Sequence, residues 1–535
     1  LEEGYTESEA AESIIENNLY GLDIDKRAYQ LAYFSLMMKG RQYSRRILNK
    51  EIENNLYYFI DSKDISIKQI DFLGGNIEDK KSREAIKKDI LEIVELFKDG
   101  RELGSIIKID KDYDYDELIE FAKNLQIEEN EQLSIGTENI DKTQEELMHI
   151  LKLSKILSSK YEIVVTNPPY LANTDTKGSL KKYIDSKYKN TKIDLFAVFM
   201  EVSENLLSKN GYYGMINQHS WMFLYSYSNY RNEFLLNNTI MNLLHLGPRL
   251  FDTQDVGTLV QSVAFIVKNI SLDKYKAKYF RLVDFNNSDQ KKNALISNKN
   301  IYCTDKHNYS LIDNTPIAYW ISKNISKIFL KYKSIGDTYE VKQGMTTSDN
   351  KRFLRYWHEV LNLNIGFNCN ELKDAKDSQK KWFPYNKGGL SRKWYGNNDT
   401  VVNYENDGEE LKKFHKKLNK TSSGGRLKNR LYYFKEAISW VYITNMNSFG
   451  ARYIPAGFIF DVSGSSLFAN DGEKYYILGL LCSKISIEFM NILNPTMNFQ
   501  VRDIKNIPII FSETHKQEID SLVQENISIS KIDWD

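Results

Sequence analysis

Apolar and polar positions along the first 325 residues alternate between strand spacing and helix spacing. Short alternating or β-branched runs predict strands, and apolar residues recurring every three to four positions predict helices between them. The run at residues 161–166 is apolar through its centre and predicts a buried strand. A succession of this kind is typical of an α/β sheet. The predicted strands cover residues 19–25, 65–72, 161–166, 212–216 and 260–267, and helical spacing marks residues 9–18, 26–38 and 194–207.

The chain divides by texture into four parts. Residues 78–160 are charged, poor in glycine and helical in spacing, which indicates an insertion between two parts of the sheet, residues 1–77 and 161–325. Beyond about residue 325, aromatic, glycine and basic residues are interleaved and the predicted strands are short. Residues 330–535 are therefore expected to form a separate α+β domain, with the boundary near 325–335.

Composition narrows the class of protein. The 535 residues are 41% hydrophobic and contain no run of 18 or more apolar residues, so we expect a cytoplasmic protein without a membrane span. The three scattered cysteines form neither a metal-ligand spacing nor a disulfide framework, and no metal site is expected. The chain opens Leu-Glu-Glu-Gly without an initiator methionine, which we interpret as the middle of a larger protein.

Net charge is zero, but its distribution is uneven. Residues 411–435 hold nine Lys or Arg and no acid. Local charge decides where a phosphate backbone can bind, so this run is a candidate nucleic-acid contact. The alternative is a solvated surface.

The tetrapeptide Asn167-Pro168-Pro169-Tyr170 ends the predicted strand at residues 161–166. The exocyclic amine of adenine is a poor nucleophile, and two acceptors for its N–H hydrogens would help it react. The Asn167 side chain and the Pro168 carbonyl can supply them, while Pro169 holds Pro168 extended and Tyr170 offers a ring for stacking. Such a base must first leave the duplex. A rigid turn after a strand is the alternative.

Acidic residues at strand ends suggest a nucleoside site. Asp23 ends the first predicted strand and suits hydrogen bonds from ribose hydroxyls, whereas Asp25 is expected to cap the following helix. Asp71 and Phe72 end the next predicted strand and could accept from, and pack on, an adenine ring. Helix capping, or a polar strand end, explains each acid equally well by itself.

These motifs together resemble a known family. The chain is similar to the adenine-specific DNA methyltransferases of phage-defence (BREX) systems and to Eco57I-like type IIG restriction-modification proteins. The resemblance rests on residues 19–25, 167–170, 194–196 and 211–214, and in the last part on residues 343–353, 458–461 and 498–504.

The resemblance implies fold and activity. It implies part of a Rossmann-like methyltransferase sheet with a helical insertion, followed by an α+β target-recognition domain. It also implies direct methyl transfer from S-adenosylmethionine to adenine N6 in double-stranded DNA, with further proteins of the defence system as partners. By position only, Phe251 matches a second aromatic that sandwiches the flipped base.

One departure from the family pattern concerns the cofactor. A Gly-x-Gly loop should precede Asp23 by one strand-helix unit, but the twenty-two residues before it contain none. We therefore expect a fragment that lacks the N-terminal part of the fold and binds the cofactor weakly or not at all.

Basic and amide side chains of residues 330–535 are candidates for reading DNA. Phosphate contacts set the register, whereas arginine suits guanine and amides suit adenine, so Arg392, Arg426 and Gln500 are the expected base readers. Core aromatics and a solvated face are the alternative. The complete set of DNA-binding candidates is Lys342, Arg352, Lys381, Arg392, Lys393, Arg426, Lys428, Arg430 and Gln500.

The sequence leaves two rival functions open. Enzymes that methylate protein glutamine amides use the same tetrapeptide, because that nitrogen is equally planar. The basic, aromatic-rich region after residue 325 has no role in such an enzyme and favours DNA. The other rival is a DNA-recognition or partner-docking module, in which these 535 residues by themselves perform no chemistry.

Overall fold

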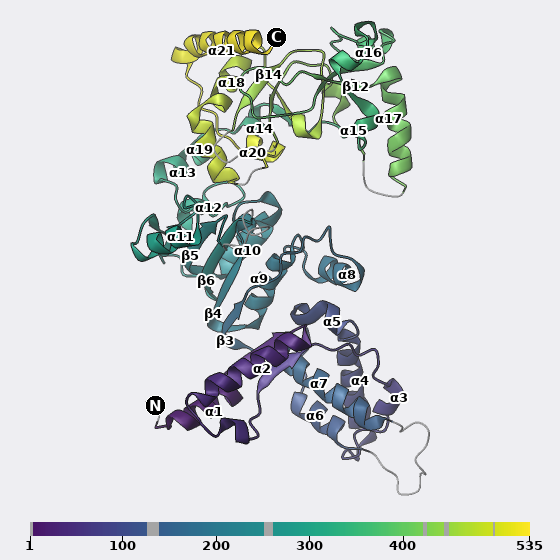
Figure 1. Cartoon of the computed structure of the whole chain (residues 1–535), viewed down its shortest axis with the longest axis vertical. Coiled ribbons are helices and arrows are strands. Elements are labelled where there is room, and N and C mark those ends of the chain that lie inside the picture. The colour runs from purple at the N-terminus through teal and green to yellow at the C-terminus, as the bar shows by residue number, and fades with distance from the viewer. Residues whose placement is uncertain (1–3, 126–138, 251–259, 421–424, 443–448, 496–497) are drawn as a thin grey trace. The chain divides into compact units, whose positions relative to one another are not determined.

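The computed structural model describes residues 4–125, 139–250, 260–420, 425–442, 449–495 and 498–535 (Figure 1). These residues form two compact units, and the chain passes between them more than once. The first unit contains residues 1–218, 234–272 and 277–301, and the second contains residues 219–233, 273–276 and 302–535. The last passage falls earlier than residue 325, where the texture of the sequence changes.

A two-stranded parallel sheet opens the first unit. Strand β1 (Tyr20–Asp23) pairs with β2 (Asn55–Tyr58), and helix α2 (Lys26–Arg41) follows β1 at once. The Asp25 carboxylate accepts from the Arg27 N–H and caps α2, as the sequence predicts. A capping box at Thr6 starts the preceding helix α1 (Glu7–Asn17) in the same way.

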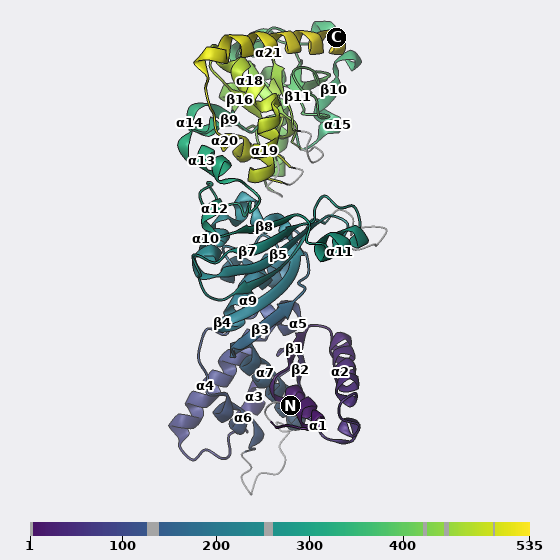
Figure 2. The same ribbon diagram turned by 90° about the vertical axis from the view of Figure 1, so that its left-hand side faces the viewer.

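A larger mixed sheet forms the other part of the first unit (Figure 2). Strand β3 (Tyr161–Thr166) pairs in parallel with β4 (Leu207–Gln218), and α9 (Leu195–Leu206) connects the two. The strand order continues β4-β6-β5-β7, with β6 antiparallel to both of its neighbours. The α/β class and the predicted elements near 161, 194, 212 and 260 are confirmed. The remaining strands are β5 (Thr239–Gly247), β6 (Ser262–Lys268) and β7 (Ala277–Arg281).

The charged region at 78–160 is helical, as predicted, but it does not fold apart from the sheet. Apolar residues of its helices share one hydrophobic core with Phe59, directly after β2, and with residues of α9. Close backbone approach ties it to the segment after β2, since a Cβ on Gly100 would lie 2.2 Å from the Ile60 carbonyl oxygen. Its helices are α4 (Lys80–Leu96), α5 (Gly100–Leu103), α6 (Tyr115–Lys123) and α7 (Ile140–Ser158).

The predicted strand at residues 65–72 is wrong. Residues Ile67–Ile70 form a helical turn, α3, and the strand that pairs with β1 is Asn55–Tyr58. Ile65, Ile70 and Leu73 are all buried. Their spacing of five and three suits a helical turn packed on a core better than a strand with a period of two.

The strand at residues 161–166 exists, but it is not buried as predicted. Within the described part of the chain, β3 pairs only with β4, and β1 pairs only with β2. Ile163 and Val165 remain 69% and 76% exposed on β3. One long edge of each strand therefore lies open, and the apolar run that predicts burial faces solvent.

The second unit is α+β, with two four-stranded sheets, ordered β10-β12-β11-β15 and β14-β13-β16-β9. Two buried apolar clusters form its core, and both lie wholly within residues 312–523. Its strands are β9 (Glu340–Lys342), β10 (Leu354–Tyr356), β11 (Trp382–Asn386), β12 (Thr400–Asn403), β13 (Ala437–Trp440), β14 (Ala451–Ile454), β15 (Ile459–Phe460) and β16 (Ser466–Phe468).

Helices accompany these two sheets. No single helix in the described ranges is long and apolar enough to cross a membrane. The helices of the second unit are α12 (His307–Ser310), α13 (Lys323–Lys331), α14 (Ile335–Thr338), α15 (Asn350–Phe353), α16 (Leu372–Asp377), α17 (Glu405–Leu418), α18 (Lys474–Cys482), α19 (Lys484–Leu493), α20 (Val501–Lys505) and α21 (Glu513–Trp534). The first unit also contains α8 (Gly178–Lys187) and α11 (Ser288–Ile296). Helix α10 (Ser228–Asn237) and strand β8 (Ile301–Thr304) lie where the chain passes from one unit to the other.

Candidate active site and nucleic-acid interface

The tetrapeptide at residues 167–170 leaves the end of β3 and is fixed to the start of α9. The Leu171 N–H donates to the Asp194 Oδ1 at 3.0 Å, and the Leu195 N–H donates to the Leu171 carbonyl at 3.0 Å. The Asn173 N–H donates to the Ile193 carbonyl, also at 3.0 Å. These three bonds hold the loop without using any polar group of the tetrapeptide itself.

Asn167 and Pro168 present two acceptors. Asn167 is exposed, whereas Pro168 is buried. Among the residues that the structure describes, neither the Asn167 amide nor the Pro168 carbonyl has a hydrogen-bond partner. Both groups therefore remain available as hydrogen-bond acceptors.

Tyr170 is 36% exposed and meets the ring of Phe196 edge to face, with the ring centroids 6.1 Å apart. Burial raises the pKa of the Tyr170 hydroxyl. The edge-to-face contact with Phe196 holds the Tyr170 ring in place and leaves one face of it for stacking.

Asp194 positions this loop. Its Oδ1 accepts from the Phe196 N–H at 3.3 Å as the N-cap of α9, in addition to the bond from Leu171. Burial raises the pKa of this carboxyl, while the backbone N–H bonds lower it. One side chain thus caps the helix and anchors the loop, which makes it a positioning residue.

Carboxylates stand at the ends of both β1 and β2. Asp23 is exposed, and its Oδ1 accepts from the Asp25 N–H at 2.8 Å. The Phe59 N–H, directly after β2, donates to the Asp23 carbonyl at 3.1 Å. Two residues later Asp61 accepts from the Arg101 N–H at 2.9 Å. Because β1 and β2 are parallel, these acids lie at the same edge of the sheet.

Asp71 and Phe72, predicted to hold the cofactor, follow the helical turn α3 and not a strand. Asp71 pairs with Lys87 of the insertion. With the strand moved to residues 55–58, Asp61 takes the position that the sequence assigned to Asp71. Phe251, the predicted second stacking ring, lies outside the described residues.

His149 was missed by the sequence interpretation. Its Nε2 lies 2.8 Å from the Tyr58 carbonyl at the end of β2, and its ring contacts those of Tyr57 and Tyr58. Burial lowers the pKa of His149, which favours the neutral imidazole. No sequence signal marks it, because 91 residues separate the two partners.

Several predicted DNA-binding side chains are held by partners within the second unit. Arg352 pairs with Glu410 at 2.7 Å, and Lys428 donates to the Gln343 Oε1 at 2.7 Å. The others that are held are Lys342 with Glu340, Arg392 with Asp533 and the Trp534 ring, Lys393 with the Cys482 carbonyl, and Arg430 with Asp407 and Tyr404. Lys381, Arg426 and Gln500 are exposed.

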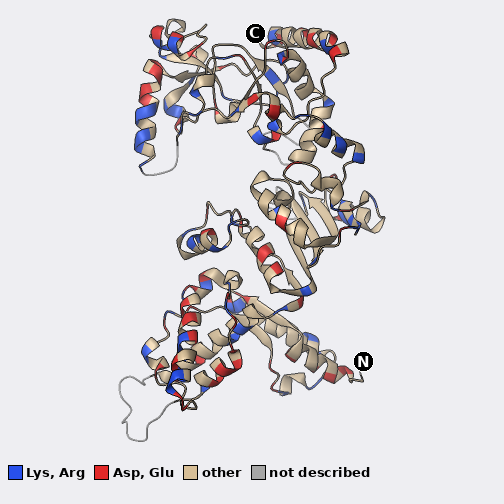
Figure 3. Cartoon of the chain, turned by 180° about the vertical axis from the view of Figure 1, so that it is seen from behind, with Lys and Arg blue, Asp and Glu red and all other residues tan. Residues whose placement is uncertain are grey.

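An open hollow of about 610 Å³ lies between α17 and residues 425–430. Lys416, Lys420 and Arg426 line it and are exposed, and none of them has an ion-pair partner among the described residues. The basic end of α17 follows its acidic start along the helix (Figure 3). This cluster, called the basic hollow below, is the best-placed group of cations from the predicted run.

Gly425 makes the basic hollow possible. Its φ of +87° is a conformation that glycine adopts easily, and a Cβ there would lie 2.4 Å from the His415 ring. The His415 ring is itself buried, with Nε2 3.2 Å from the Thr347 carbonyl. The close approach seats Arg426 beside α17.

The described residues contain no group of three or more His, Cys, Asp or Glu side chains that could hold a metal ion.

Relatives of the chain are large enzymes. It is 38% identical to adenine-specific methyltransferase PglX of Lacticaseibacillus casei (strain Zhang), over 99% of this chain and 44% of that protein. It is 34% identical to adenine-specific methyltransferase BrxX of Escherichia coli O9:H4 (strain HS), over 100% and 43%. The chain thus spans less than half the length of either relative.

Solved structures with a similar arrangement include restriction-modification enzymes. One is a nuclease-deletion mutant of the Type ISP enzyme LlaGI with a DNA substrate mimic (TM-score 0.49, 13% identity, 96% of this chain and 44% of that one). Another is the DrdV–DNA complex (TM-score 0.49, 11% identity, 98% and 57%). Residues 17–251 match the Eco57I restriction-modification methylase family, and this range contains the tetrapeptide, Asp23 and Asp194. The chain is thus similar to the adenine-specific methyltransferases PglX and BrxX over its whole length, and to the Eco57I restriction-modification methylase family over residues 17–251.

Proposed function

We propose that the protein containing this chain methylates adenine N6 in double-stranded DNA, as part of a phage-defence or restriction-modification system. The observation that carries the proposal is the loop at residues 167–170, anchored through Asp194 while the Asn167 amide and the Pro168 carbonyl stay unpaired within the described chain. The relatives named adenine-specific methyltransferases support the choice of base.

The loop prepares the amine for reaction. A flipped adenine stacks on Tyr170, and its amine donates one hydrogen to the Asn167 side-chain oxygen and the other to the Pro168 carbonyl. These bonds shift electron density onto the nitrogen. The nitrogen could then take the methyl group of a bound sulfonium donor as the carbon–sulfur bond breaks, with the thioether as leaving group and one N–H proton lost to solvent. Placement of acceptors that need not reorganise accounts for much of such catalysis.

S-adenosylmethionine, the methyl donor usual for such enzymes, fits the residues present only in part. It supplies an electrophilic methyl group when bound. Asp23 and Asp61, carboxylates at the ends of adjacent parallel strands, suit its ribose hydroxyls and its adenine amine. The cofactor roles expected for Asp71 and Phe72 remain predictions.

The remainder of the cofactor site lies, in this proposal, outside the 535 residues. The edges of β1 and β3 that are open expose backbone groups able to pair with another strand. The Tyr20 and Tyr161 rings, one at the start of each strand, are 5.1 Å apart. Leu31 and Phe34, three positions apart on α2, are 66% and 61% exposed. A further strand and helix would cover all of this apolar surface.

DNA binds, in this proposal, to the second unit through the basic hollow. Lys416, Lys420 and Arg426 would neutralise phosphates, and Arg426 is the one predicted base reader in the hollow. Arg392 is engaged by α21, so its predicted role requires release from Asp533.

The test uses the full-length protein with tritiated S-adenosylmethionine and unmodified bacterial DNA. Label should appear as N6-methyladenine, and Asn167→Ala should reduce it at least about 100-fold, because a transition-state acceptor is lost. Asn205→Ala, at an exposed position of α9, is the matched control and should retain activity. Label on protein in place of DNA would favour glutamine methylation and contradict the proposal.

A second candidate concerns the 535-residue chain by itself. The open edges of β1 and β3 favour a DNA-recognition module without catalysis. Calorimetric titration with S-adenosylmethionine separates the two, because ordinary cofactor affinity of the isolated chain would contradict this second candidate.

A further inference from the structure

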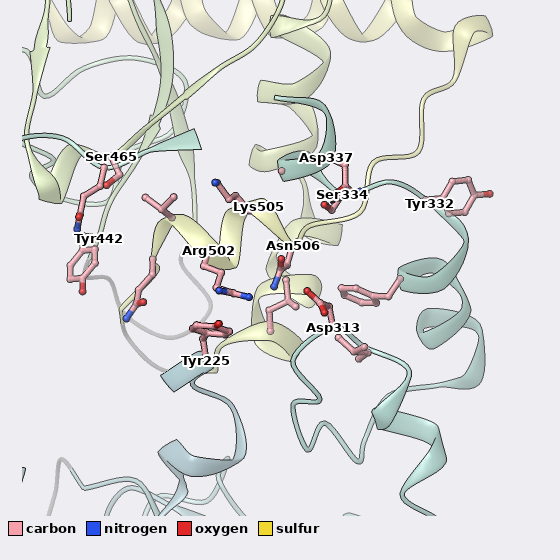
Figure 4. A pocket seen from close by; sticks show the side chains of 17 residues that line it. Tyr225, Asp313, Tyr332, Ser334, Asp337, Tyr442, Ser465, Arg502, Lys505 and Asn506 are labelled. Carbon is pink, nitrogen blue, oxygen red and sulfur yellow. Dashed lines mark hydrogen bonds between the residues drawn. The ribbon is translucent and has the colours of Figure 1, made fainter. Parts of the chain in front are cut away.

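A cavity of about 840 Å³ opens beside α20 within the second unit (Figure 4). Its volume lies in the range of ligand sites, roughly 300–1,000 Å³. Of the residues proposed from sequence to bind DNA, only Gln500 lines it. The cavity is therefore a site that the proposed chemistry leaves unassigned.

Two cations of α20 line this cavity. Arg502 and Lys505 are three positions apart, so they lie on one face of the helix (Figure 4). The Arg502 guanidinium lies 3.1 Å from the centroid of the Tyr225 ring and donates to the Asn314 Oδ1 at 3.1 Å. Its Nε is buried and has no hydrogen-bond partner among the described atoms. Arg502 is thus held in place by the Tyr225 ring and Asn314, and its side chain lines the cavity.

The aliphatic part of the Lys505 side chain packs against α14, whereas its ammonium group forms no ion pair among the described residues. A Cβ on Gly336 would lie 2.8 Å from the Lys505 Cβ, so the glycine of α14 lets the two segments touch. In the described part of the chain no carboxylate lies within 4.0 Å of the Lys505 Nζ. The ammonium group remains available to an anion.

Two acidic residues, Asp313 and Asp337, also line the wall, and among the described residues neither forms an ion pair with Arg502 or Lys505. The Asp337 carboxylate accepts from the Ser334 N–H and hydroxyl, both at 2.8 Å, as the cap of α14. Asp313 accepts only from the neighbouring Asn314 amide, at 3.3 Å, among the described groups, so it can receive an amino group from a ligand.

The cavity also offers groups suited to a base. Tyr442 contributes a ring, and Gln343 contributes an amide whose oxygen already accepts from Lys428 at 2.7 Å. The NH₂ group of Gln343 is therefore its free donor among the described contacts. Cations for a phosphate, a donor and an acceptor for base edges, and a ring for stacking together match one nucleotide.

Lys428 links the cavity to the basic hollow. It directly follows Arg426 and Leu427, which line the hollow, and its ammonium group bonds to the Gln343 side chain in the cavity wall. A DNA strand bound at the basic hollow could therefore continue into the cavity. A free nucleotide would occupy the cavity without using this link, so the link favours DNA as the ligand.

We propose that this cavity holds one nucleotide of the bound DNA strand, with its phosphate on Arg502 and Lys505 and its base beside Tyr442 and Gln343. The inference rests on the proposed DNA methylation. It adds a second contact region to the basic hollow, at residues outside the basic run at 411–435.

The test is fluorescence anisotropy of a labelled DNA duplex with the 535-residue chain at several salt concentrations. Lys505→Gln should weaken binding roughly tenfold and lower the slope of log K against log salt by about 1, because one phosphate contact is lost. Arg502→Lys keeps the charge but loses the ring contact and the fork, so it should weaken binding with little change in slope. Lys484→Gln, at an exposed position of α19 outside the cavity, is the matched control.

Thermal unfolding of each variant accompanies the titrations. Unchanged affinity and salt slope in a folded Lys505→Gln variant would overturn the inference and leave the methylation proposal intact. Binding of free deoxyadenosine monophosphate that Lys505→Gln abolishes, without any effect on the duplex, would overturn it as well. If the full-length protein does not methylate DNA but still binds it through Lys505, only the proposed function would be contradicted.

Discussion

Ile163→Thr and Val165→Thr together probe the open edge of β3. Both side chains are branched at Cβ, as is threonine, so the strand preference is kept while apolar surface is lost. They are 69% and 76% exposed. The double variant of the 535-residue chain should therefore lose less than about 0.5 kcal/mol per site.

The same substitutions should cost much more in the longer protein if a further strand and helix cover β3, because Ile163 and Val165 project from one face of the sheet. Fully burying an Ile or Val side chain stabilises by about 1.5–3 kcal/mol. About seven-tenths of that surface is exposed at each site. Such a cover would then contribute roughly 1–2 kcal/mol per residue, or about 2–4 kcal/mol for the pair.

Hydrogen–deuterium exchange of peptides covering β3 measures this difference directly, because exchange reports local stability. A gain of 2–4 kcal/mol corresponds to about 30- to 700-fold slower exchange in the longer protein, since 1.4 kcal/mol is tenfold. The double variant should remove this gain. Ile266→Thr on β6, a strand paired on both sides, is the control and should act equally in both lengths.

Two outcomes would refute the reasoning. Equal exchange of β3 in the short and long proteins would show that nothing covers its edge. A variant as costly in the 535-residue chain as in the longer protein would show that Ile163 and Val165 are already buried.

Two further predictions concern the second unit. Arg231 is buried and donates to the carbonyls of residues 221, 223, 224, 314 and 315, so Arg231→Met should lower the free energy of unfolding by about 3–5 kcal/mol in urea titrations. A loss below about 1 kcal/mol would show that these carbonyls find other donors. Burial raises the pKa of Asp503 to about 6, so its contribution to stability is complete below about pH 4 and is lost as the pH rises through 6, by about 3 kcal/mol. Asp503→Asn should abolish that slope, and an unchanged pH profile would refute the assignment.

The loop at residues 167–170 could be predicted from sequence because its determinants are local. The β-branched run before Asn167 specifies a strand, and two consecutive prolines end it. Asp194 and Asp25 precede helical spacing, where a short acidic side chain satisfies free N–H groups of the first turn. Each signal lies within a few residues of the structure that it specifies.

Long-range partners could not be predicted in this way. His149 reaches the end of β2 across 91 positions, and Arg392 meets Asp533 across 141. The strand assignment near residue 65 failed for a related reason, since burial of Ile70 and Leu73 comes from helices of the insertion. A pattern of apolar residues shows that a segment is buried but does not show against what.

The sequence by itself determined the strand and the proline turn that end at residues 167–170, the α/β and α+β classes, and the presence of a basic run. Tertiary structure decided which of the predicted residues are available. It engages Arg430 with Asp407 and Arg392 with α21, leaves Arg426 exposed, and puts Asp61 after the strand that pairs with β1, whereas Asp71 follows a helical turn. The physical reason is that charge and hydrogen-bonding capacity belong to a residue type, whereas their availability depends on neighbours that only the folded chain brings together.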